Sequence, residues 1–176
     1  MAFSAEATVT VGQVLTAAIW NLNVRDNVNY LGTNRPHCDL NNNANISLAN
    51  TTITALTFNV ERQDIGGLHS LVSNTSRVTI VDAGFYLLSG NVSFAANATG
   101  VRAALLRLNG STVLAEDLRA SAGGSDNTII HIGGRLYQLA AADYIELCGY
   151  QSSGGALNAL TVANYSPELE ALWETT

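Results

Sequence analysis

The sequence predicts an all-β protein, an antiparallel sandwich or barrel that follows a single N-terminal helix. Eight or nine short segments with β pattern succeed one another from residue 51, at the spacing typical of such folds. In the clearest segment, 84–94, one parity is mostly apolar: Tyr86, Leu88, Val92 and Phe94. Because a strand sends alternate side chains to opposite faces, we expect one face of this segment in a core.

Residues 1–33 are expected to form an arm with an extended start, 7–11, and then a helix that Thr16 caps and Gly32 ends. Four large apolar residues recur in it at spacings of four, four and three: Trp20, Val24, Val28 and Leu31. They form one stripe on a helix of about four turns. An isolated helix of this length is only marginally stable in water. A self-contained coiled coil needs about three or four heptads and the stripe offers about two, so it must lie against something else.

Residues 34–50 are expected to be an irregular linker, because they combine Pro36 with a cluster of asparagines. The β domain is then expected to span 51–176. Its predicted strands are 53–60, 78–81, 84–94, 102–108, 111–118, 127–132, 135–137, 144–151 and 157–165. Asn109-Gly110 predicts a type I′ hairpin turn, which needs positive φ at both positions.

Two of these segments, 101–108 and 144–150, are apolar on both faces. In the second, Ile145 and Leu147 share one parity and are expected in the core. A free antiparallel sandwich normally has one wetted face, so we expect sister subunits to cover the outer face of these strands.

The composition narrows the possible partners. Charged residues make up 12% of the chain, against about 25% in ordinary domains, which favours a surface covered by other subunits. The net charge is −6 and every Lys+Arg position is arginine, so binding to nucleic acid or an anionic membrane is not expected. The N-terminus shows no signal-peptide pattern, and Cys38 and Cys148 are expected to be reduced thiols.

No set of residues predicts catalysis. The triplet His37-Cys38-Asp39 falls short of the four ligands of a structural zinc site, although a threefold axis could triplicate one histidine. His69 could act as a catalytic base only beside a nucleophile, and the sequence contains no nucleophile-elbow motif of the type Gly-x-Ser-x-Gly. Glu116 and Asp117 are adjacent and would point to opposite faces of a strand. We therefore expect no enzyme activity, no cofactor and no metal.

The β domain resembles the C1q and tumour-necrosis-factor-like jelly rolls. Gly84-Phe85-Tyr86 matches the Gly-aromatic-aromatic opening of a family strand, and 102–118 matches the hairpin that follows it. Residues 139–147 match a later corner and strand, with Ala142 where the family has glycine. The resemblance covers about 51–173. It implies a jelly-roll β-sandwich that forms a homotrimer, with apolar outer faces packed round a threefold axis.

Residues 10–31 resemble a segment that recurs in structural proteins of tailed bacteriophages, with the pattern Leu-Thr-Ala, then Trp-Asn, then Arg-Asp-Asn. This resemblance implies a virion protein assembled in the cytoplasm of a bacterial host. We expect a trimeric capsid decoration or cementing protein whose helix stripe anchors it to the major capsid protein or another virion protein.

The alternative is a trimeric tail-fibre or tail-tip protein that binds a host receptor through loops 95–100, 121–126 and 151–156. These loops are small, polar and poor in aromatic residues, which favours decoration because binding hot spots favour Trp, Tyr and Arg.

Overall fold

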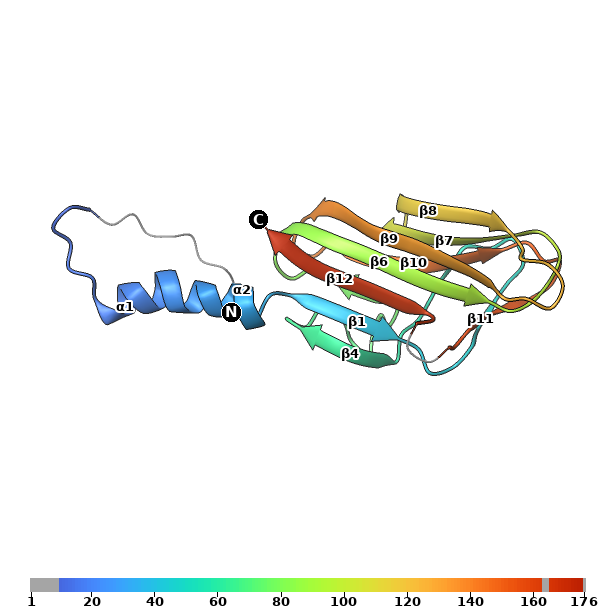
Figure 1. The fold of residues 1–176 in the computed structure, drawn as a ribbon, viewed down its shortest axis with the longest axis horizontal. Helices are drawn as coiled ribbons and strands as arrows, with labels where there is room; N and C mark the ends of the chain where they lie inside the picture. Colours follow the sequence, from blue (N-terminus) through green and yellow to red (C-terminus); the bar gives the residue numbers. More distant parts are fainter. Residues whose placement is uncertain (1–9, 163–164, 176) are drawn as a thin grey trace. The chain divides into compact units, whose positions relative to one another are not determined.

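The computed structural model describes residues 10–162 and 165–175. The chain divides into two compact units, Met1–Arg35 and Pro36–Thr176. The first contains the helix and the second contains the strands (Figure 1). Part of the extended start expected at 7–11 lies outside the described residues.

The first unit contains one helical run in three parts: α1 (Ala17–Trp20), a π-helical turn η1 (Asn21–Arg25) and α2 (Asp26–Thr33). Thr16 caps the run as expected, because its hydroxyl accepts the N–H of Ile19 at 3.3 Å. Gly32 does not end it. This glycine stays within α2 and outside the left-handed conformation of a helix-ending glycine, and Asn34 is the C-terminal cap.

The second unit is a sandwich of two antiparallel sheets, which confirms the predicted fold class (Figure 1). One sheet has the order β2 (Ile46–Leu48), β11 (Leu157–Leu160), β6 (Gly84–Phe94), β12 (Glu168–Thr175), β1 (His37–Asn41), β4 (Val60–Ile65), and β9 (Thr128–Leu139) also pairs with β6. The other has the order β3 (Thr54–Ala55), β10 (Tyr144–Gln151), β7 (Val101–Leu108), β8 (Thr112–Ala120), and β5 (Arg77–Thr79) also pairs with β10.

The core lies between the sheets. The six side chains expected there are fully buried, at 0% exposure: Tyr86, Leu88, Val92, Phe94, Ile145 and Leu147. The last strand, β12, adds Trp173, whose indole N–H donates to the carbonyl of Ala83 at 3.3 Å. Burial of these apolar groups is the main force that holds the two sheets together.

The expected linker at 34–50 is wrong, because this segment contains β1 and β2. Strand β1 pairs with both β12 and β4, and its Cys38 and Leu40 are buried. The asparagines are part of the fold: Asn41 donates to the carbonyl of Pro167 at 3.1 Å, and Asn42 donates to that of Thr57 at 2.6 Å. The sandwich unit therefore begins at Pro36, not at residue 51.

Other strand limits also differ from the prediction. The single strand expected at 53–60 is two short strands, β3 and β4, in different sheets. The strands expected at 127–132 and 135–137 are one, β9, which continues through Gly133 and Gly134 with a register shift against β6. The strand expected at 157–165 is confined to β11 among the described residues. The hairpin turn is as predicted, with φ of 51° at Asn109 and 73° at Gly110.

Strands β7 and β10 bury side chains on both faces, as predicted. On the outer face, however, other residues of the same chain cover part of these side chains. Ala103, Leu105 and Cys148 form a second apolar cluster, and Ala55 and Tyr150 pack against it. Sister subunits are therefore not needed to bury these three side chains, which corrects the reason given for expecting a trimer.

Candidate functional site

An apolar row crosses the outward face of the first sheet. Leu87 of β6 pairs with Leu136 of β9 on one side and with Leu172 of β12 on the other. Its parity is opposite to that of the buried Tyr86 and Leu88, so the row points away from the core. Leu87 is 39% exposed and Leu136 is 55% exposed. Side chains of this size, side by side on a sheet, are typical of a contact surface.

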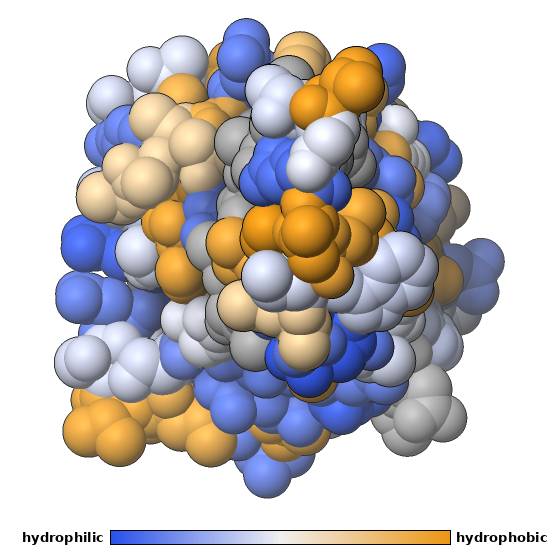
Figure 2. Space-filling model, turned by 90° about the vertical axis from the view of Figure 1, so that its left-hand side faces the viewer, coloured by the Kyte–Doolittle hydropathy of each residue, from blue (hydrophilic) through white to orange (hydrophobic). Residues whose placement is uncertain are grey.

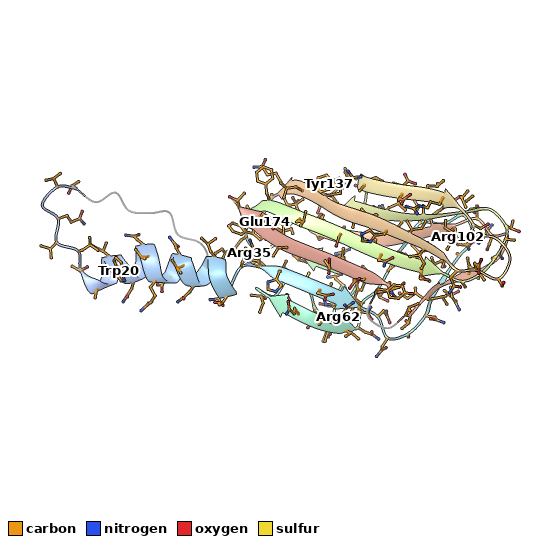
Figure 3. The ribbon with its side chains drawn as sticks, in the orientation of Figure 1. Trp20, Arg35, Arg62, Arg102, Tyr137 and Glu174 are labelled. Carbon is orange, nitrogen blue, oxygen red and sulfur yellow. The ribbon has the colours of Figure 1, made fainter. Side chains whose placement is uncertain are left out.

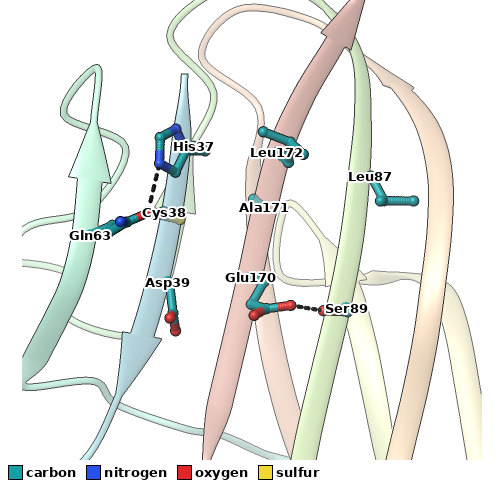
Figure 4. Close-up of a pocket in the computed structure, with 9 residues that line it drawn as sticks. All are labelled: His37, Cys38, Asp39, Gln63, Leu87, Ser89, Glu170, Ala171 and Leu172. Atoms are coloured by element: carbon teal, nitrogen blue, oxygen red, sulfur yellow. Dashed lines mark hydrogen bonds between the residues drawn. The ribbon is translucent and has the colours of Figure 1, made fainter. Parts of the chain in front are cut away.

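Beside the row lies a hollow of about 250 Å³, lined by His37, Cys38, Asp39, Gln63, Leu87, Ser89, Glu170, Ala171 and Leu172 (Figure 4). Two hydrogen bonds order its polar walls. His37 Nε2 and Gln63 Oε1 are 2.9 Å apart, and the Ser89 hydroxyl donates to Glu170 Oε2 at 2.6 Å. The hollow combines an apolar end with a polar end.

Three carboxylates cluster at this place: Asp39 and Glu170, which line the polar end, and Glu168 beside them. Ligand atoms of Asp39, Glu168 and Glu170 lie within 4.8 Å of one another. Arg62 supplies the opposite charge, with Nη2 2.6 Å from Glu168 Oε1 and Nε 3.5 Å from Asp39 Oδ1. Burial raises the pKa of Asp39 and of Glu168 above the usual range, Arg62 opposes the rise and Glu170 adds to it. The cluster is thus a partly neutralised acidic patch.

The triplet His37-Cys38-Asp39 does not converge on a metal. It lies in β1, where Cys38 points into the core and its two neighbours take the other parity. Burial raises the pKa of the Cys38 thiol strongly and that of Cys148 to about 11. Both thiols are therefore poor nucleophiles at neutral pH. The pair Glu116 and Asp117 lies on β8, where Asp117 is held by Arg119 at 2.6 Å.

His69 has a structural partner that the sequence pattern did not indicate. Its side chain is 0% exposed; Nδ1 lies 2.8 Å from Glu61 Oε1 and Nε2 lies 3.1 Å from the carbonyl oxygen of Thr75. The ring therefore fastens the loop after β4 to that strand. Such a pairing between neighbours in space carries no sequence signal.

Arg102 is another residue that the sequence pattern did not single out. It is 0% exposed, and its guanidinium donates to the carbonyls of Thr99 and Val101, each at 2.9 Å, and of Asn97 at 3.0 Å. Burial lowers its pKa. The side chain lies at the end of the sandwich opposite the C-terminus, where it organises loop 95–100 (Figure 3).

The four stripe residues of the helix lie on its surface: Trp20 is 54% exposed, Val24 37%, Val28 61% and Leu31 50%. Trp20 is marked on the helix in Figure 3. Figure 2 shows orange hydrophobic side chains at the surface among hydrophilic ones. The helix thus offers a second apolar contact surface.

The comparisons with known proteins define the class of fold. No protein-family model and no curated protein sequence matches the chain. Solved structures do: murine APRIL at pH 5.0 aligns with a TM-score of 0.61 and 16% identity, over 80% of this chain and 99% of that one. Eiger TNF from S. frugiperda aligns with a TM-score of 0.57 and 12% identity, over 80% and 94%. The chain therefore has the TNF-like jelly-roll fold. In its described part, no helix is long and apolar enough to cross a bilayer.

Proposed function

We propose that the chain is a homotrimeric structural protein of a tailed-bacteriophage virion, which decorates the capsid and is attached through its N-terminal segment. The observation that carries the proposal is the pair of uncovered apolar surfaces, the row at Leu87 and Leu136 and the helix stripe that begins at Trp20. The resemblance of 10–31 to phage structural proteins is the reason for proposing a virion protein. The jelly-roll fold is the reason for proposing a trimer.

In the proposed trimer, the apolar row of one subunit receives the edge of the next. Strands β8 and β9 lie together at one edge of the sandwich, and Val113 and Ile129 on them are 47% and 45% exposed. A contact between two different surfaces closes into a ring when its rotation is one third of a turn. Ring closure would bury three such rows, one in each subunit. The apolar area removed from water stabilises the assembly by about 25 cal/mol per Å².

The attachment is assigned to the N-terminal segment. Before the helix, Val11 and Val14 are among the most exposed apolar residues of the described chain, at 108% and 78%. An extended segment with such side chains can pair with a sheet edge of the platform protein or insert into its grooves. A decoration protein held in this way stabilises the shell because it binds only the assembled state.

Cryo-electron microscopy of the intact virion tests this function. We expect jelly-roll density on the outside of the capsid at threefold or quasi-threefold positions, joined to the shell by the N-terminal segment. Density confined to the tail tip contradicts decoration, and absence of the chain from purified virions contradicts the whole proposal.

One observation favours receptor binding as a second candidate. Arg102 holds loop 95–100 by two hydrogen bonds, to the carbonyl oxygens of Asn97 and Thr99, and a preordered loop loses little entropy on binding. If this loop binds a receptor, Arg102→Met should loosen it, raise its amide hydrogen exchange and weaken adsorption of virions to host cells. Unchanged adsorption with increased exchange rules out this candidate.

A further inference from the structure

We propose that the helix stripe is covered by two other copies of the same helix, so that the three N-terminal helices of the trimer form a parallel bundle. This inference rests on the proposed homotrimer and names the partner of its stripe. The attachment to the virion is then made by the chain before the helix, and the helices form a stalk.

The stripe is exposed along its whole length, and Leu22, on another side of the helix, is also 52% exposed. Trp20 and Val28 are 54% and 61% exposed, whereas Asn27 and Tyr30 on the adjoining face are buried, at 6% and 0%. The stripe is thus exposed, whereas these two side chains are not. An exposed apolar strip fits a bundle in which each helix contacts its neighbours along one face.

The spacing of the stripe fits helices that run almost straight. Trp20 and Leu31 are eleven residues apart and the stripe makes three turns between them, by steps of four, four and three. An eleven-residue repeat corresponds to about 3.67 residues per turn, close to the 3.6 of a straight α-helix. The spacing therefore keeps the stripe close to the helix axis over α2, whereas the π-helical turn η1 shifts its direction locally around Val24.

The charge of the helix fits a second copy of itself. The chain carries −6 overall, but Arg25 and Asp26 are the only charged residues in 17–33. They pair with each other, with Arg25 Nε 2.8 Å from Asp26 Oδ1. Parallel identical helices place like charges near one another, and a neutral helix avoids that repulsion.

A stripe this short gives only weak association between free helices, and the jelly-roll trimer compensates for this because it holds the three helices close together. Three residues separate the end of α2 at Thr33 from the start of β1 at His37, and each extended residue spans at most about 3.6 Å. Three jelly rolls held together would thus keep their helices at an effective concentration on the order of millimolar. Association that is too weak for the free helix becomes favourable in the trimer.

Cysteine cross-linking of the full chain tests the bundle. The variant Val28→Cys places a thiol on the stripe, and Asn29→Cys, one residue further and about 100° round the helix, is the matched control. The native Cys38 and Cys148 are buried, so they give little background. After mild oxidation, non-reducing electrophoresis should show a disulfide-linked dimer for Val28→Cys. At most two of the three chains of a trimer can be linked in this way. The dimer band should be absent for Asn29→Cys.

Trp20 gives a second readout without a substitution in the helix. The other tryptophan, Trp173, is 2% exposed, so quenching by acrylamide reports mainly on Trp20. In the bundle we expect weak quenching and emission shifted to shorter wavelength. Light scattering on the same samples separates the two proposals. A trimer with equal cross-linking at both positions, or with none and a freely quenched Trp20, overturns the bundle alone; a monomer overturns the homotrimer and the bundle together.

Discussion

Removing the apolar row should dissociate the proposed trimer without unfolding its subunits. The double variant Leu87→Gln, Leu136→Gln replaces two leucines that are 39% and 55% exposed, which together amount to about one fully buried leucine when a neighbour covers them. Full burial of a leucine contributes about 1.5–3 kcal/mol. The change therefore costs about that much per subunit, and about 4.5–9 kcal/mol per trimer.

The assay is analytical ultracentrifugation over a dilution series. Each 1.4 kcal/mol changes the dissociation constant of the trimer about tenfold. The protein concentration at which half of the trimer has dissociated varies as the square root of that constant. This concentration should therefore rise by roughly 40-fold or more. Leu71→Gln, at a loop residue that is 50% exposed, is the control and should leave this concentration unchanged. The dissociated subunits should remain folded by circular dichroism, because all three side chains are on the surface of the single chain. An unchanged trimer in the double variant refutes the assignment of the row to the subunit contact.

Two further predictions concern pH and the loops. Because burial raises the pKa of Asp39, the folded state disfavours its charged form; this contribution to stability is greatest in acid and is lost as pH rises through the raised pKa. Asp39→Asn should flatten that part of a melting-temperature profile against pH, and a profile unchanged by the substitution counts against it. Gly100→Ala should cost more than about 2 kcal/mol in chemical denaturation, because φ is +75° and the new Cβ would lie 2.0 Å from the carbonyl oxygen of Ser152. Gly123→Ala, with φ of +86° and nothing within 4 Å, should cost only about 1–2 kcal/mol, and equal losses would contradict the steric argument.

The sequence predicted those parts of the fold that local pattern determines. Alternation in 84–94 depends on one strand alone, and the six core residues taken from 84–94 and 144–151 are all buried. Asn109-Gly110 predicted its turn because positive φ at both positions is a property of those two residues. The N-terminal cap at Thr16 is local in the same way.

The missed strand β1 shows where local pattern fails. Only Cys38 and Leu40 mark its buried parity, which is too short a signal beside Pro36 and the asparagines that follow. What makes the segment a strand is pairing with β12, more than 120 residues later in the chain. Such pairing is decided by tertiary packing, which overrides local propensity.

The candidate surfaces were only partly predictable for the same reason. The helix stripe was visible because its period is local, whereas the row at Leu87 needs Leu136 and Leu172 from two other strands brought into register. The burial of Arg102 follows from the carbonyls of a loop that wraps round it. Neither arrangement has a sequence signature.

The central claim is that three copies assemble through these apolar surfaces, and the mass of the purified full chain in solution tests it most directly. Light scattering coupled to size exclusion should give about 55 kDa, three times the 18.5 kDa of one chain, over a wide range of concentration. A stable mass of 18.5 kDa under the same conditions would contradict the account.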